Sequence, residues 1–158
     1  MKARERASLA SNARNAQAWL LMGGVHGTQA RWKAQQGQGR DEDFEQAARA
    51  FEKALELEPE SFEARLDWGD LLHAWSVWKK DAGRAPTPPV ERGLALVEEV
   101  LSSCPEWPRA LLLRAKLGTI RAGTEAHADA QQLWRAQASE DLSRAFTKNP
   151  HLKVGWKP

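Results

Sequence analysis

The residue types that most often carry catalysis or hold metals are sparse in this sequence. Cys104 is the single cysteine, and the four histidines, at positions 26, 73, 127 and 151, are far apart along the chain. A cysteine nucleophile needs a base within hydrogen-bond reach, and metal-binding histidines on a helix are usually one turn apart. Neither spacing is present. We therefore expect no enzyme, no bound metal and no cofactor, and we interpret Cys104 as a packed or half-exposed thiol.

Two short motifs are similar to a metal-binding acidic cluster and to a phosphate-binding loop, but both have simpler interpretations. The acidic run Asp41, Glu42 and Asp43 directly precedes a predicted helix, where acids cap free N–H groups and complement the helix dipole. Gly37 and Gly39 lack the preceding strand and the third glycine of a phosphate-binding loop. We interpret the acids as helix caps and the glycines as a turn that ends a helix.

Basic residues beside tryptophans raise the alternative of nucleic-acid binding. Arg31 and Lys33 flank Trp32, and two lysines follow Trp78. Aromatic rings can stack on bases while cations contact phosphates. However, 23 basic residues against 21 acidic ones leave a net charge of only +2, which disfavours a nucleic-acid coat. We expect both tryptophans to pack against neighbouring helices, with the lysines solvated.

Length and composition limit the elements that could position any site. The 158 residues, 17.7 kDa, fit a single domain over residues 1–158 with a core of its own. One cysteine favours the reducing cytoplasm. No apolar stretch approaches a signal peptide or the roughly 20 residues of a membrane helix, so we expect no membrane partner. Eight tryptophans and no tyrosine indicate large packing residues.

Three segments that each end in proline repeat one pattern of small and large residues. Pro59, Pro105 and Pro150 lie 46 and 45 residues apart. The residues before each proline place a small, a large and a second apolar side chain at i, i+4 and i+7, on one helical face. The three sets are Ala47, Phe51 and Ala54; Gly93, Val97 and Val100; and Ala138, Leu142 and Ala145. The pattern predicts three units of helix, connection and helix, and so an all-α chain.

A long first helix is predicted in each of the first two units. Apolar residues at steps of three and four from Phe62 through Ala82 predict about 21 helical residues, roughly 30 Å. In the first unit the stripe that we expect to face inward is Ala18, Met22, Val25, Gln29 and Trp32. Glycines and prolines at 37–39 and 83–89 end these helices.

The second helices follow these breaks. They are expected to begin near Asp43 and Val90. In the third unit Gly123 ends the first helix, and Thr124 caps a long second helix that carries Trp134 on its inner side. Residues 4–13 are interpreted as the frayed end of a preceding helix.

At these positions the chain resembles the tetratricopeptide repeat (TPR) family. The family signature reads here as Trp19, Met22, Gly23, Ala47, Phe51, Ala54 and Pro59 in the first unit. The second unit has Arg65, Trp68, Gly69, Gly93, Val97, Val100 and Pro105, and the third has Leu111, Arg114, Ala115, Ala138, Leu142, Ala145 and Pro150. The units are about 12 residues longer than the standard 34. This long form is similar to the C-terminal repeat arrays of some bacterial serine/threonine protein kinases.

The resemblance implies a right-handed superhelix of three lengthened units, 14–59, 60–105 and 106–150, followed by a tail at 151–158. It also implies a non-catalytic scaffold, such as the regulatory region of a kinase, that binds a peptide or partner helix in a concave groove. Alternatives are a small chaperone or assembly factor for a secretion or envelope complex, and a nucleic-acid-binding repeat. Self-association through the end faces is a further expectation. The expected groove residues are Gln17, Leu20, Thr28, Glu63, Leu66, Asp70, His73, Arg109, Leu112, Lys116 and Ile120.

Overall fold

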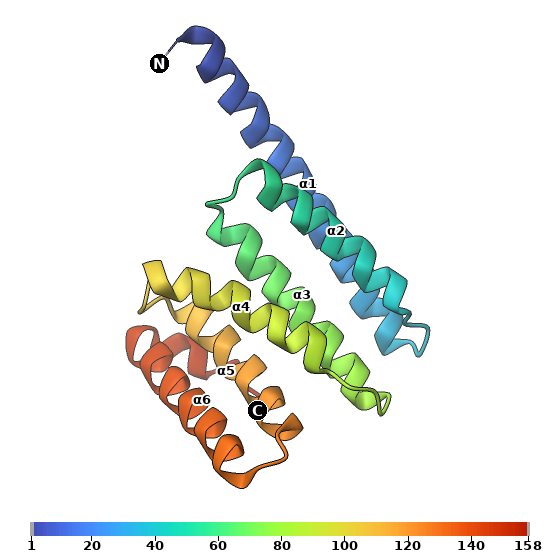
Figure 1. Ribbon diagram of the computed structural model, residues 1–158, viewed down its shortest axis with the longest axis vertical. Helices are drawn as coiled ribbons and strands as arrows, with labels where there is room; N and C mark the ends of the chain where they lie inside the picture. The colour runs from blue at the N-terminus through green and yellow to red at the C-terminus, as the bar shows by residue number, and fades with distance from the viewer. Residues whose placement is uncertain (1, 158) are drawn as a thin grey trace. The chain divides into compact units, whose positions relative to one another are not determined.

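The computed structural model describes residues 2–157, so Met1 and Pro158, the outermost residues of the expected domain, lie outside the described residues. The described chain is all-α, as predicted, and its six α-helices pack as consecutive antiparallel pairs without a sheet (Figure 1). They are α1 (Ala3–Gln35), α2 (Asp41–Leu57), α3 (Phe62–Asp81), α4 (Thr87–Ser103), α5 (Pro108–Thr124) and α6 (Ala128–Lys148), followed by the 3-10 turn η1 (Pro150–Lys153). Two compact units meet within α3, between Leu71 and Leu72.

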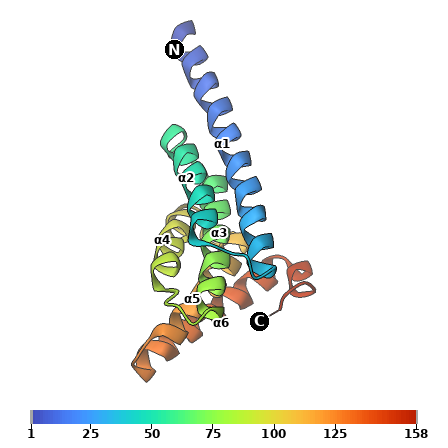
Figure 2. The same ribbon diagram turned by 90° about the vertical axis from the view of Figure 1, so that its right-hand side faces the viewer.

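In the first unit, α1 is one continuous helix of 33 residues that runs past the end of α2 (Figures 1 and 2). The expected separation of residues 4–13 from the first repeat is therefore wrong. No glycine or proline occurs between Ala3 and Met22, so nothing in the local sequence ends the helix.

The buried face of α1 is built from small residues. Gly23 and Gly27 belong to it, and a Cβ atom at Gly23 would lie 2.7 Å from the ring of Phe51 on α2. A Cβ atom at Gly27 would lie 3.4 Å from Leu71 on α3. Such close approach leaves no space for a larger side chain at Gly23 or, without adjustment of Leu71, at Gly27. The full buried set is Ala16, Leu20, Gly23, Gly27 and Ala30.

The inward stripe predicted for this helix is consequently wrong. Met22, Val25 and Trp32 are 46%, 57% and 58% exposed, and Ala18 and Gln29 are exposed as well. The predicted helical period of 3.6 residues is correct, but the prediction assigned the large residues to the packed side of the helix. Here the packed side takes the glycines and alanines, because the neighbouring helices approach α1 closely.

An ion pair joins the end of α1 to the start of α2. Gly37 turns the chain with a φ of +72°, as the predicted break requires. The ammonium of Lys33 then donates a hydrogen bond of 2.9 Å to the buried carboxylate of Asp43, and Arg40 lies 3.4 Å from the same oxygen. The bond from Lys33 lowers the pKa of Asp43 below 3.8, against the opposing effect of burial.

This arrangement corrects two expectations. The N-cap position of α2 is Arg40, without a side-chain cap, and Asp43 binds Lys33 instead of acting as a cap. Lys33 is correspondingly engaged in an ion pair, where a solvated lysine was expected.

The face predicted for the second helix of each repeat is the packed one. Ala47, Phe51 and Ala54 are buried on α2, and the equivalent positions are buried on α4 and α6 except for the half-buried Leu142. Gly93 on α4 shows why its position needs a small residue, since a Cβ atom there would lie 2.9 Å from Leu117 on α5.

The second unit contains the end of α3 and the helices α4 to α6. Gly83 turns the chain with a φ of +70°, and α4 begins at Thr87, about one turn before the expected start. Proline in its first turn is compatible with the helix, because that turn lacks N–H partners in any case.

The connection between α5 and α6 differs from prediction. Thr124 is the last residue of α5, and its hydroxyl donates a 2.8 Å bond to the carbonyl of Arg121. It therefore does not cap α6, which begins at Ala128 after a three-residue loop whose last residue, His127, is the N-cap. Trp134 faces α5 as expected, 3.6 Å from the Cβ position of Gly118.

Trp156, for which the sequence suggested no role, packs onto the second unit. Its ring lies 6.2 Å from that of Phe146 in an edge-to-face arrangement, and the ammonium of Lys116 lies 5.8 Å from the ring centroid. The C-terminal tail is thus held against α5 and α6.

Candidate functional site

A hollow in the first unit lies between α1 and α3. It has a volume of about 520 Å³ and is open to solvent. Four of the expected groove residues meet there: Gln17, Leu20 and Thr28 from α1, and Glu63 from the first turn of α3. The remaining lining residues are Leu21, Gly24, Val25, Gln29 and Asp67.

A smaller hollow of about 220 Å³ adjoins the first one and shares Gly24, Thr28 and Asp67 with it. Asp70, another expected groove residue, lines this second hollow together with Arg31. Glycines of α1 line this hollow and have no side chains to fill it, so the ring of Phe51 on α2 also forms part of the lining. The structure thus brings five of the expected residues to one continuous surface.

Leu66 does not belong to this surface. It is fully buried and contributes to the core, although it lies on the same helix as Glu63 and Asp70. The five remaining expected residues are in the second unit, at the end of α3 and along α5. Arg109 is exposed, His73, Leu112 and Lys116 are half-buried, and Ile120 is buried.

Four large apolar side chains between residues 21 and 32 of α1 are exposed, and two of them, Leu21 and Val25, line the larger hollow. Leu21, Met22, Val25 and Trp32 are 63%, 46%, 57% and 58% exposed. We call Leu21, Met22, Val25 and Trp32 the α1 ridge. Leu21 was not among the expected groove residues. The run Leu20-Leu21-Met22 could have indicated it, because three consecutive helical residues cannot all face one partner, so at least one of them must be exposed.

The larger hollow is acidic. Glu63 and Asp67 are one helical turn apart on α3, and no lysine or arginine is among its lining residues. Arg31 lines only the smaller hollow, beside Asp67 and Asp70. Glu63 is exposed, so its carboxylate can attract a cationic group of a partner that covers the apolar side chains.

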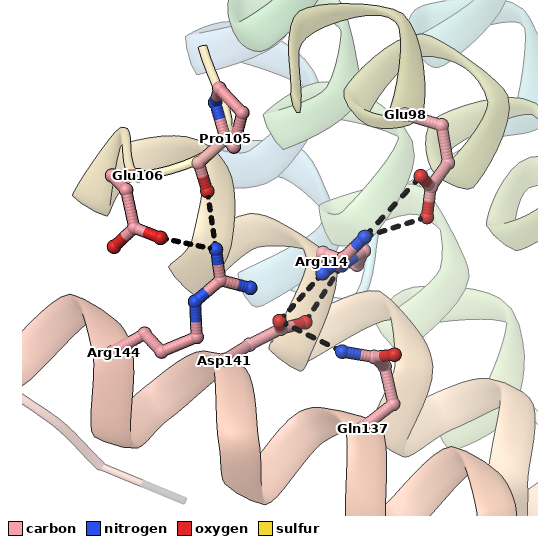
Figure 3. Close-up of polar contacts among 7 residues, drawn as sticks. All are labelled: Glu98, Pro105, Glu106, Arg114, Gln137, Asp141 and Arg144. Carbon is pink, nitrogen blue, oxygen red and sulfur yellow. Dashed lines mark hydrogen bonds and ion pairs between the residues drawn. The ribbon is translucent and has the colours of Figure 1, made fainter. Parts of the chain in front are cut away.

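A connected polar cluster in the second unit was also missed. Asp141 on α6 is 0% exposed, and its carboxylate accepts bonds of 2.8 and 2.7 Å from the guanidinium of Arg114 on α5 and 3.1 Å from Gln137 (Figure 3). Arg114 also binds Glu98 on α4, at 3.1 and 3.3 Å. These bonds raise the pKa of Arg114 still further above its usual range, so the guanidinium stays charged.

This cluster is a link between three helices. Both carboxylate oxygens of Asp141 are engaged, and the carboxylate is closed off from solvent, so a ligand has no access to it. Nearby, Arg144 on α6 donates to the carbonyl of Pro105 and to Glu106, which ties α6 to the turn after α4 (Figure 3). The cluster explains why Arg114 occupies a signature position that holds Trp68 in the second repeat: its charge is matched by Asp141.

Cys104 is half-buried at the C-cap of α4. Among residues 2–157, no group of three histidine, cysteine, aspartate or glutamate side chains could hold a metal ion. No helix over the same range is both long and apolar enough to cross a membrane.

Comparisons with protein-family models, with curated proteins and with solved structures found no match to this chain.

Proposed function

We propose that this protein is a non-catalytic TPR-like module that binds a peptide or helix of a protein partner on the α1 and α3 surface. The observation that carries the proposal is the α1 ridge, an apolar row left exposed beside an acidic hollow. Contiguous exposed apolar surface with a polar rim is typical of interaction sites in soluble proteins.

The repeat architecture supports the assignment to a TPR-like right-handed superhelix. Each antiparallel pair buries a small residue of its second helix, Ala47, Gly93 or Ala138, at the predicted position. Gly23 meets Phe51, so the glycine and the large residue of the first signature are in contact. Stacked helix pairs of this kind expose their first helices along one side, where ligands bind.

The exposed apolar side chains of α1 would contribute to the affinity for a partner that covers them. Burying an exposed leucine or valine fully contributes about 1.5–3 kcal/mol, and a tryptophan has more surface to bury. Covering Leu21, Val25 and Trp32 together offsets part of the entropy that association costs. Glu63 then orients the partner without supplying most of the affinity.

The test is selection of binding peptides from a random library displayed on phage, with the folded chain as bait. We expect selected peptides to lose binding to the double variant Leu21→Ser/Val25→Ser. The matched control is Leu133→Ser, because Leu133 on α6 is even more exposed than Leu21, and this change should leave binding unchanged. Peptides that bind the double variant and the parent chain equally would show that the site lies elsewhere, and circular dichroism checks that the variants fold.

A further inference from the structure

One tryptophan attaches the C-terminal tail, residues 150–157, to α5 and α6 of the second unit. The ring of Trp156 is half-buried and lies 6.2 Å from that of Phe146 on α6, at an interplanar angle of 70°. The ammonium of Lys116 on α5 lies 5.8 Å from the centroid of the same ring. Val154 is 91% exposed, and a Cβ atom at Gly155 would meet nothing within 4 Å. The link that leads to Trp156 is therefore not packed against the helices.

The hydrogen bonds described for this tail are local. The backbone N–H groups at positions 152, 154 and 156 each donate to the carbonyl three residues earlier, at 3.2, 3.3 and 3.4 Å. The turn η1 contacts α6, and its Leu152 is half-buried. An aromatic pair and a cation–π contact at a partly exposed site each shift a local equilibrium by only about twofold to tenfold. The tail can therefore leave this surface by a local opening that does not unfold α5 or α6.

A second tryptophan beside α5 provides the contrast of a permanently packed ring. Trp134 belongs to α6 itself, lies 3.6 Å from the Cβ position of Gly118, and has the guanidinium of Arg121 at 5.8 Å from its ring. Arg121 also pairs with carboxylates. The contact that the structure describes for the ammonium of Lys116 is the ring of Trp156. Trp134 is fixed by its helix, whereas Trp156 is held by a segment that can open.

We propose that Lys116 and Phe146 form a docking surface for a short segment that presents a tryptophan, and that the chain's own tail occupies this surface as a displaceable cover. The tail identifies the chemistry of the occupant: a ring that meets Phe146 edge-to-face and offers its π face to a cation. The proposal goes beyond the proposed function, because it concerns the second unit and does not involve the α1 ridge.

The test uses the full chain with Trp156→Ala, in which the surface loses its cover, and a synthetic peptide of residues 149–158. The peptide is titrated into isotope-labelled protein, and NMR chemical shifts report binding even when it is weak. We expect shifts at Lys116 and Phe146. We also expect the variant to bind the peptide at least about tenfold more tightly than the parent chain, whose own tail competes at a high effective concentration. The same peptide with Trp156→Ala should cause no shifts.

Removal of the cation locates the site. Adding Lys116→Ala to the Trp156→Ala chain should weaken binding of the peptide about fivefold, because the ring loses its cation. Arg135→Ala in the same background is the matched control, since Arg135 is an exposed cation on α6 about three turns from Phe146. It should leave the affinity within about twofold.

Thermal unfolding distinguishes a cover from a structural element. Trp156→Ala should lower the unfolding midpoint by less than about 5 °C, because the tail can open while the helices stay packed. A larger loss, or a variant that does not fold, would make Trp156 part of the core and overturn the displaceable cover.

The remaining outcomes each overturn a defined part of the proposal. Equal affinity of the peptide for the parent chain and Trp156→Ala, equal shifts with the alanine peptide, or no binding at millimolar peptide overturns the docking surface. A dimer of the parent chain that Trp156→Ala dissociates would mean that the tail covers a second copy, which overturns the cover within one chain. None of these results involves Leu21 or Val25, so the proposed function is decided by its own test.

Discussion

Truncation of Arg114 should destabilise the second unit more than truncation of Asp141. The carboxylate of Asp141 is 0% exposed, and the Arg114 side chain is 14% exposed. In Arg114→Leu the buried carboxylate keeps only the 3.1 Å bond from Gln137. In Asp141→Leu the guanidinium keeps two bonds to Glu98, a residue that is open to water.

The magnitudes follow from this asymmetry. Removing one partner of a buried ion pair costs about 3–5 kcal/mol, because the other charge is left without compensation. We expect Arg114→Leu to lower the free energy of unfolding by an amount at the upper end of this range. Asp141→Leu should lower it by about 1–2 kcal/mol less. The double variant Arg114→Met/Asp141→Leu should recover most of the loss, since an apolar pair has no charge to desolvate.

The assay is urea unfolding followed by circular dichroism at constant pH and salt. Arg135→Leu on α6 is the matched control, because Arg135 is exposed, and it should change stability by less than about 0.5 kcal/mol. The reasoning is refuted if Asp141→Leu costs as much as Arg114→Leu or more, or if the double variant is as unstable as the sum of the single ones.

Three further predictions concern the first unit. Gly23→Ala should destabilise this unit by about 1–3 kcal/mol, because the added Cβ atom would overpack against Phe51. Gly24→Ala should stabilise it by about 0.5–1 kcal/mol, because its Cβ atom would meet nothing within 4 Å. Thermal unfolding of both variants and the parent chain measures the two effects. Gly37→Ala should cost about 1 kcal/mol because φ is +72°, and Gly37→Asn should cost less; equal losses would contradict a left-handed turn. The lowered pKa of Asp43 means that its ion pair stabilises the fold above the unfolded pKa of about 3.9 and ceases to do so as pH falls through the lower folded value. The difference in urea midpoint between the parent chain and Asp43→Asn should therefore shrink between pH 6 and pH 3, and a constant difference would exclude this mechanism.

The helical content and its breaks could be predicted because they depend on neighbours in sequence. The boundary at Gly37 and the extent of α3 agree with prediction, since glycine and proline act on the backbone locally. The burial of Ala47, Phe51 and Ala54 was predictable for a related reason: a periodic small and large pattern already defines a face.

The inner face of α1 could not be predicted, because two faces compete on that helix. One carries Met22, Val25 and Trp32, and the other carries Gly23 and Gly27. Hydrophobicity alone favours the first. The second face is the buried one because Phe51 and Leu71, on other helices, approach α1 closely there. The sequence of α1 alone gives no information about that approach.

The sequence by itself determined the all-α class, the repeat positions on the second helices and the turns at Gly37 and Gly83 within the first two pairs. Propensity, backbone sterics and hydrophobic period set these features over spans of a few residues. The tertiary structure decided which side chains meet. It pairs Arg114 with Asp141, 27 residues away, it turns large residues of α1 to the surface, and it brings Glu63 and Leu21 to the lining of one hollow. Those outcomes depend on interhelical distance, desolvation and pairing between distant segments, which are properties of the packed chain.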